Sequence, residues 1–150
     1  MQTRRQHLQQ SAIVAGMLAS TGLFPQFAHA AFNKAAFDAK SIADALKAYG
    51  AGAPSESKDV TITAPDIAEN GAVVPLGAST SLPNVKQLLI LVEKNPSSLV
   101  AMFNITDSID AAVSTRAKMG QSSDVYAVAL TTDGKALFAK KEVKVTLGGC

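Results

Sequence analysis

Most of the chain after residue 58 alternates hydrophobic and polar positions, the period expected of β-strands with one buried face. Valine and isoleucine alternate with threonine over residues 60–63. Residues 113–119 alternate small or apolar residues with Ser114, Arg116 and Lys118, which predicts a strand with a solvated, basic outer face. Residues 88–92 are instead continuously apolar and lie between turn-forming sequences, which favours a central strand over a helix.

Two further strands carry features that position them. A turn at residues 69–71 precedes a strand at 73–76, which we place at an edge or a bulge because Pro75 has no N–H to donate. Alternation over residues 99–105 puts Leu99 on the same side of the next strand as Ala101, Phe103 and Ile105.

The last two strands are expected to form a hairpin. Asp133-Gly134 is a strong turn signal between apolar runs at residues 125–131 and 135–147. With these, the chain has about seven short strands separated by turns. The pattern predicts an all-β fold, an antiparallel β-sandwich.

Before the strands, the pattern changes to that of a helix. Ile42, Ala45, Leu46 and Tyr49 recur at helical spacing within residues 31–49, and Gly50 provides a stop signal. A linker rich in small residues follows at 51–57. The apolar stripe of this N-terminal helix is expected to cover the chain's own sheet, and packing on a second subunit is the alternative.

The first 30 residues resemble an export signal. Thr3-Arg4-Arg5-x-x-Leu8 is similar to the twin-arginine pattern, a modestly apolar stretch follows, and Ala28-His29-Ala30 is a cleavage signal. A general secretory signal or a membrane anchor are the alternatives. We therefore expect a twin-arginine-type signal peptide at residues 1–30 and a mature domain at 31–150, exported to the periplasm after folding.

Charge and composition exclude several classes of function. Two of the 14 basic residues lie in the first 30 positions, so 12 basic residues face 12 acidic residues in the remainder. This balance offers no electrostatic basis for binding nucleic acid or anionic lipid. Both histidines, His7 and His29, precede residue 31. The mature domain therefore has no His-based catalytic triad or His-ligated metal site, and we expect neither metal nor cofactor.

The candidate chemistry lies at Cys150, the single cysteine of the chain and its last residue. Gly148 and Gly149 precede it, and their conformational freedom predicts a flexible arm that carries the sulfur ~10 Å beyond the sandwich. An accessible thiol on such an arm suits a covalent shuttle. A frayed end whose cysteine links two copies and a labelling handle are the alternatives, whereas catalysis by the thiol lacks a histidine base.

Four segments together resemble the SoxY family, the sulfur-carrier subunits of the bacterial Sox thiosulfate-oxidation system. They are residues 64–75 (APDIAENGAVVP), 92–96 (VEKNP), 114–123 (STRAKMGQSS) and 143–150 (VKVTLGGC). The segments occur in this order, and with the twin-arginine-like start they extend over nearly the whole chain. One departure is that family members usually continue for one or two glycines beyond the cysteine that corresponds to Cys150.

This resemblance implies an immunoglobulin-like sandwich that forms a heterodimer with SoxZ and holds sulfur intermediates covalently on Cys150. It also implies transient partners: SoxAX conjugates thiosulfate to the cysteine, SoxB releases sulfate, and SoxCD oxidises the remaining sulfane sulfur. The chain would then be a carrier and not an enzyme. In the alternative, the protein is a periplasmic interaction module in which Cys150 only links two copies. Arg116 and Lys118 are expected to be solvated, with guidance of the anionic intermediate as the alternative.

Overall fold

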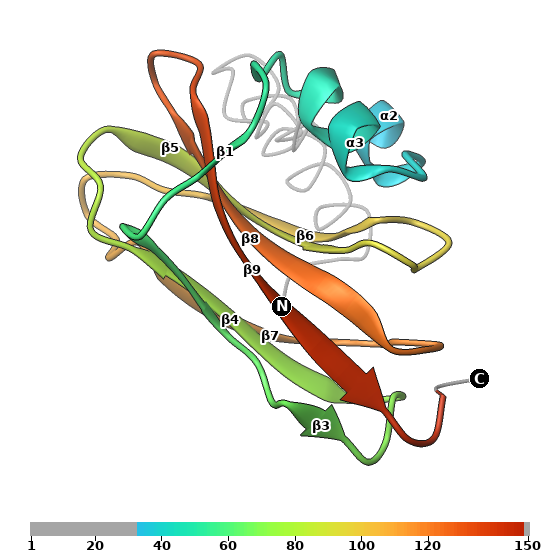
Figure 1. Ribbon diagram of the computed structural model, residues 1–150. Helices are drawn as coiled ribbons and strands as arrows, with labels where there is room; N and C mark the ends of the chain where they lie inside the picture. The colour runs from blue at the N-terminus through green and yellow to red at the C-terminus, as the bar shows by residue number, and fades with distance from the viewer. Residues whose placement is uncertain (1–32, 149–150) are drawn as a thin grey trace, which may run out of the picture. The chain divides into compact units, whose positions relative to one another are not determined.

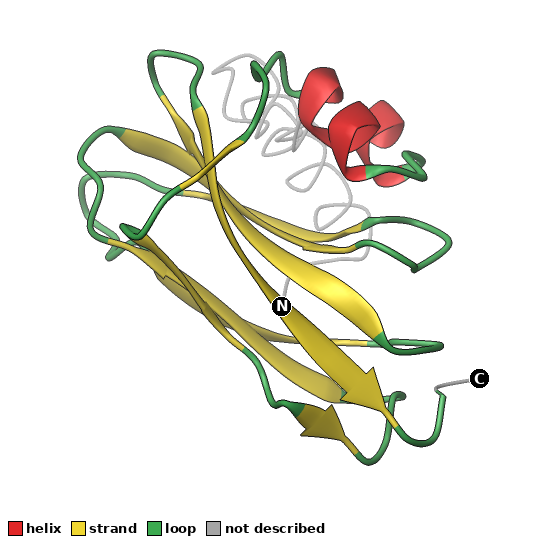
Figure 2. Ribbon diagram, viewed as in Figure 1, coloured by secondary structure: helices red, strands yellow, loops and turns green. Residues whose placement is uncertain are grey.

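Two β-sheets pack face to face, and two short helices cover the outer face of the larger sheet (Figure 1, Figure 2). This arrangement is that of a computed structural model, which describes residues 33–148. The predictions for residues 1–30, for Gly149 and for Cys150 lie outside the described residues.

The larger sheet has the strand order β1-β9-β8-β5-β6, and β3 pairs with the same strand, β9, as β1 does. Its members are β1 (Ser55–Glu56), β3 (Ile67–Ala68), β5 (Val85–Val92), β6 (Leu99–Asn104), β8 (Ser123–Thr131) and β9 (Ala136–Val145). The smaller sheet has the order β2-β4-β7, with β2 (Val60–Thr63), β4 (Val74–Thr80) and β7 (Ala112–Ala117).

Within the described residues, the seven longer strands confirm the predicted sandwich of about seven strands, and all their pairings are antiparallel. The strands that the sequence pattern missed are β1 and β3, which have two residues each and pair in parallel with β9. Strand β1 lies inside the predicted linker. Two residues are too few for any alternation to be recognised, so these strands depend on β9 rather than on their own sequence.

Burial on both faces explains the continuous apolar run in β5. Leu88, Ile90 and Val92 belong to the core between the two sheets, whereas Leu89 and Leu91 belong to a second core beneath the helices. All five side chains are fully buried. Because both faces of β5 are covered, its sequence has no polar positions in this run, and the predicted central strand is confirmed.

The N-terminal helix predicted over residues 31–49 is instead two helices, α2 (Lys34–Phe37) and α3 (Ile42–Ala48). The second begins because the Ser41 side chain accepts a hydrogen bond from the Asp44 amide at 3.1 Å, the geometry of a helix N-cap. The prediction of one helix was therefore wrong, and the Ser41-x-x-Asp44 spacing was the missed signal. Gly50, with φ of 69°, ends α3 as predicted.

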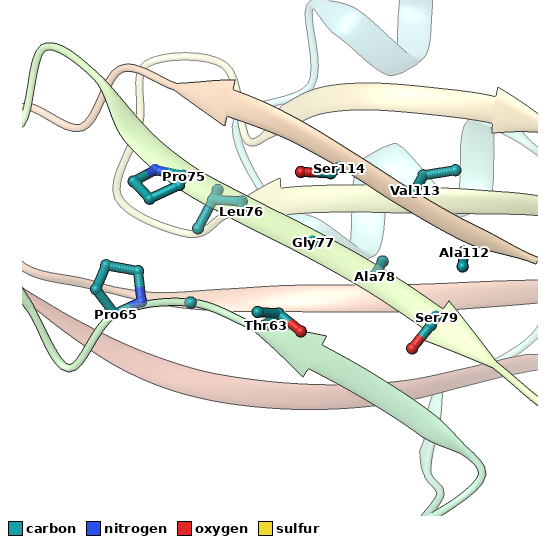
Figure 3. A pocket seen from close by; sticks show the side chains of 11 residues that line it. Thr63, Pro65, Pro75, Leu76, Gly77, Ala78, Ser79, Ala112, Val113 and Ser114 are labelled. Atoms are coloured by element: carbon teal, nitrogen blue, oxygen red, sulfur yellow. The ribbon is translucent and has the colours of Figure 1, made fainter.

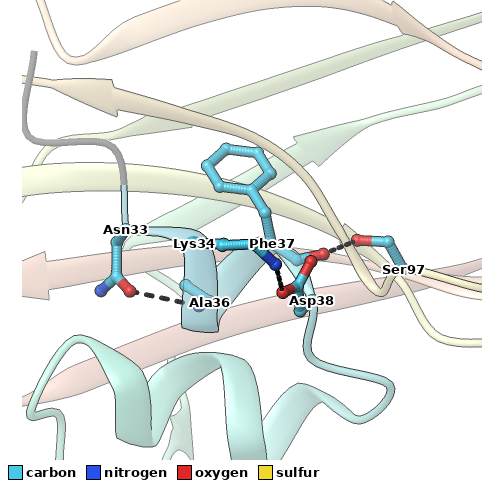
Figure 4. Close-up of polar contacts among 6 residues, drawn as sticks. All are labelled: Asn33, Lys34, Ala36, Phe37, Asp38 and Ser97. Atoms are coloured by element: carbon cyan, nitrogen blue, oxygen red, sulfur yellow. Dashed lines mark hydrogen bonds and ion pairs between the residues drawn. The ribbon is translucent and has the colours of Figure 1, made fainter.

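Both helices are tied to the larger sheet and to each other, and Figure 4 shows the contact between α2 and Ser97, which lies between β5 and β6. Asn33 caps α2 through its side-chain oxygen and donates from Nδ2 to the Ala48 carbonyl at 2.8 Å. The Ser97 hydroxyl donates to the Phe37 carbonyl, and the Ser98 amide donates to the Ala39 carbonyl at 3.1 Å. The apolar stripe of the helices thus covers the chain's own sheet, as expected.

Two strand predictions need correction. Pro75 lies in β4, the central strand of the smaller sheet, and not in an edge strand. Proline is tolerated there because β2 pairs no further along β4 than Gly77, so Pro75 has a neighbour only in β7. Leu99 does not share a face of the sheet with Phe103. A bulge between β5 and β6 leaves Val100 without a partner in the register, so the alternation of side chains between the two faces shifts by one residue there.

We predict that Leu46→Ala lowers the free energy of unfolding by about 2–5 kcal/mol, because Leu46 is 1% exposed and fills the core between α3 and the sheet. Urea unfolding measures this change. Ile109→Ala is the control, since Ile109 is 53% exposed and its truncation should cost less than about 0.5 kcal/mol. Equal effects of the two substitutions would contradict the packing of α3.

Candidate functional site

The predicted arm leaves the sandwich at the end of β9, so the site is described from that strand outward. Strand β9 ends at Val145, two residues before the predicted end, and the Leu147 side chain is 71% exposed. Hydrogen bonding nevertheless continues past the strand. The Thr146 amide donates to the Ala68 carbonyl at 3.1 Å, and the Thr146 hydroxyl donates to the Glu69 carbonyl at 3.1 Å. The backbone after β9 is therefore held by the segment around β3.

Two loops extend this hold to Leu147. The Gly71 amide donates to the Leu147 carbonyl at 2.7 Å, and the Met119 amide donates to the Gly71 carbonyl at 2.7 Å. On the other side, the Val145 amide donates to the Ser122 hydroxyl at 2.9 Å. Leu147 thus belongs to a hydrogen-bonded chain that connects β9 to Gly71 and to the loop after β7.

Gly148 packs directly against this loop. A Cβ built on Gly148 would lie 2.4 Å from the carbonyl oxygen of Gly120 and 3.3 Å from its carbonyl carbon, and the first of these distances is too short for any side chain. Glycine is therefore required at position 148 for close backbone approach, a reason that sequence reasoning missed. Gly149 and Cys150 lie outside the described residues, and the flexible arm stays a prediction.

All four segments that carry the family resemblance meet at this end of the sandwich. The Asn95 side chain donates from Nδ2 to the Lys118 carbonyl at 2.7 Å, and the Lys94 amide donates to the Ser123 hydroxyl at 3.0 Å. These bonds join the second segment to the third, and the bonds of Gly71 and Ser122 join the first and third to the fourth. We call this region, residues 66–73, 94–95, 118–123 and 144–148, the arm end. These segments contain Gly71, Gly120 and Ser122, which sequence reasoning did not identify individually as site residues.

Charged side chains of both signs lie within the arm end and next to it. Lys141 forms an ion pair with Asp66, with 3.0 Å between Nζ and Oδ1, and donates to the Ala64 carbonyl at 2.6 Å. These contacts fix the chain that enters β3. Arg116 and Lys118 are exposed, as expected for solvated residues.

A strongly shifted titratable group lies far from the arm end, in the hairpin that joins β8 to β9. The pKa of Asp133 is lowered to about 2, because the Lys135 ammonium and the Thr131 hydroxyl donate to its carboxylate. Its turn neighbour Gly134 has φ of 82°, which explains the glycine of the predicted hairpin. This carboxylate stabilises a turn at the opposite end of the larger sheet.

Two of the hollows in the described residues lie away from Gly148. A groove of ≈ 490 Å³ crosses the outer face of the smaller sheet, between small uncharged side chains such as Thr63, Pro75 and Ser114 (Figure 3). A cleft of ≈ 560 Å³ lies between α3 and the larger sheet, beside Tyr126 and Phe138.

In residues 33–148 no three His, Cys, Asp or Glu side chains are grouped to hold a metal ion. None of the helices in this range has the length and apolar character needed to span a membrane.

Comparisons with known proteins agree with these observations. A family model described as sulfur oxidation protein SoxY matches residues 45–150. The sulfur carrier protein SoxY from Chlorobium limicola f thiosulfatophilum is similar at 36% identity and a TM-score of 0.64, over 71% of this chain and 97% of that one. A comparison with curated proteins finds no match.

A second similarity concerns the fold alone. A single-residue variant of superoxide reductase (neelaredoxin) from Ignicoccus hospitalis is 18% identical, with a TM-score of 0.51 over 57% of this chain and 78% of that one. At this identity, the likeness shows a shared fold alone.

We predict that Gly148→Ala loosens the arm end, because the added methyl group collides with the Gly120 carbonyl. The loss of the bond from Gly71 to Leu147, worth about 1 kcal/mol, would speed amide exchange at Gly71 about five-fold. Hydrogen exchange followed by NMR measures this rate. Gly120→Ala is the matched control, since a Cβ on Gly120 meets nothing within 4 Å. Unchanged exchange at Gly71 in Gly148→Ala would show that the contact is not needed.

Proposed function

The chain belongs to the SoxY family of sulfur-oxidation proteins, and from this premise we propose that it is a periplasmic carrier that holds the intermediates of thiosulfate oxidation covalently on Cys150. The observation that carries the proposal is the construction of the arm end. The sandwich holds the chain as far as Gly148 by hydrogen bonds and a close backbone contact, and the single cysteine follows two residues later. This arrangement supports a carrier that presents one thiol from a stable domain.

The chemistry begins with the thiol of Cys150. Its sulfur forms a bond to the sulfane sulfur of thiosulfate, which gives the thiosulfonate Cys–S–S–SO₃⁻, and one proton and two electrons leave. The electrons pass to a c-type cytochrome partner of the SoxAX kind. Hydrolysis by a SoxB-like enzyme then adds water, breaks the bond between the sulfane sulfur and the sulfonate group, and releases sulfate and two protons. A persulfide anion stays on Cys150 for a SoxCD-like oxidase, where one is present.

In this scheme the chain acts as a carrier and supplies no catalytic group. Only the thiolate form of a cysteine is a good nucleophile, and the chain has no histidine after His29 to remove the proton. The partner enzymes therefore provide the base and the electron acceptor. The contribution of this chain is to hold the sulfur in one accessible place while successive enzymes act on it.

The proposal includes a heterodimer with a SoxZ-like subunit and export through the twin-arginine route. The sequence supports export by Arg4-Arg5 and by the cleavage signal at Ala28–Ala30. Export of a folded unit suits a partner that lacks a signal of its own, because the two subunits then cross the membrane together.

Cys150→Ser should abolish covalent sulfur loading and leave the thermal unfolding temperature unchanged, because the thiol lies beyond the packed residues. The measurement is incorporation of ³⁵S from labelled thiosulfate in periplasmic extract of thiosulfate-grown cells. The control that keeps the thiol is Ser108→Ala, at an exposed serine between β6 and β7. Label bound to the serine variant would contradict the carrier function. Parent protein that accumulates only as a disulfide-linked dimer, without label, would favour the alternative interaction module.

Replacing both arginines, Arg4→Lys with Arg5→Lys, should leave unprocessed precursor in the cytoplasm. The substitution keeps the positive charge but removes the guanidinium groups that twin-arginine signals require. Immunoblots of fractionated cells measure the distribution, and Gln9→Lys serves as a control for a harmless change in the same segment. Normal cleavage of the double-lysine variant would identify a general secretory signal instead.

A further inference from the structure

Exposed apolar side chains gather at the arm end. Among the described residues, four large hydrophobic side chains are exposed: Ile67 at 58%, Val73 at 54%, Ile109 at 53% and Leu147 at 71%. Three of them belong to the arm end, whereas Ile109 lies between β6 and β7, at the opposite end of the sandwich. Exposed residues of this kind mark interaction sites when they gather at one place.

Backbone contacts connect these three residues to the segment after β9, where the chain leaves the sandwich. Ile67 is in register with Lys144 of β9, and the Gly71 amide binds the Leu147 carbonyl at 2.7 Å. Val73 follows two residues later, in a turn where its amide donates to the Asn70 carbonyl at 3.4 Å. We call Ile67, Val73 and Leu147 the apolar rim.

Covalent geometry limits how far from this rim an enzyme can meet Cys150. Gly148 packs against the backbone of Gly120, and Gly149 and Cys150 follow it in the sequence. Two residues span no more than ~7 Å in any conformation, which bounds the distance from the Cα atom of Gly148 to that of Cys150. An enzyme with a recessed active site must therefore bring the mouth of that site against the surface around Gly148.

We propose that the apolar rim is the docking surface for the enzymes that act on Cys150, and that these enzymes carry apolar side chains around the entrance of the active site. This inference rests on the proposed function. The exposed charged residues Lys118, Lys144 and Glu69 belong to the arm end together with the apolar rim. A few apolar side chains among charged residues are the composition of a transient protein interface. One shared rim also explains how different enzymes can use the same short arm.

The test compares Ile67→Ser/Val73→Ser with Ile109→Ser. The two variants alter side chains of similar exposure, and only the first changes the rim, while both leave Leu147, Gly148 and Cys150 intact. Steady-state kinetics of the thiosulfate-conjugating and sulfate-releasing enzymes of the same organism would use each carrier as the substrate. We expect the rim variant to raise KM for the carrier about five-fold or more, with kcat within about two-fold of the parent value. Ile109→Ser should leave both constants close to those of the parent, and maleimide should label all three carriers at the same rate.

Each outcome has a distinct meaning. A parent carrier that neither enzyme turns over would refute the proposed function itself. Normal turnover of the parent with equal KM values for the two variants would refute the docking surface alone. Sedimentation of Cys150→Ser with and without the rim substitutions gives a further check, because a dimer that dissociates on loss of the rim would show that the rim binds a second copy of this chain instead.

Discussion

The structure depends on how the chain is held after its last strand. Strand β9 ends at Val145, yet hydrogen bonds from Thr146 to the β3 segment and from Gly71 to Leu147 continue the hold, and Gly148 then packs on Gly120. Each bond is worth only about 1 kcal/mol, but together with the packing of Gly148 they join three segments that are distant in sequence. Without this hold, a carrier cysteine would occupy a large volume, and each enzyme would have to capture it from many conformations. In the proposed function, this hold lowers the conformational cost of presenting the sulfur to each enzyme.

The remainder of the fold serves as a rigid base for this end. Strands β5 and β8 are covered on both faces, by the smaller sheet on one side and by α2 and α3 on the other, so neither can shift without opening a core. Strand β9 pairs with β8 along most of its length, and its outer edge is protected by β1 near its start and β3 near its end. In the proposed function, such a domain contributes the position and accessibility of the sulfur and leaves catalysis to its partners.

Sequence reasoning succeeded where the signal was local and failed where it depended on distant partners. The run Leu88–Val92 and the stop at Gly50 were sufficient to predict a central strand and the end of a helix. The break before α3 was also local, in the Ser41 cap, and was overlooked. In contrast, the bulge at Val100 and the strand β3 depend on pairing with β5 and β9, and no periodicity reveals them.

For the site, Gly148 was predicted as flexible, whereas the structure adds a contact with Gly120 that sequence spacing does not encode. The role of Cys150 came from family resemblance and from its position in the sequence.

In the proposed function, Cys150 carries the sulfur of thiosulfate and the fold holds the chain just before it. Fragmentation mass spectrometry of the protein isolated without reductant, from cells growing on thiosulfate, would locate that sulfur. We expect a C-terminal fragment whose added mass equals a thiosulfonate group or its remaining sulfane sulfur, with every other fragment unmodified. A Cys150 that is unmodified, or joined only to a second copy of the chain, in all such preparations would contradict the proposed function.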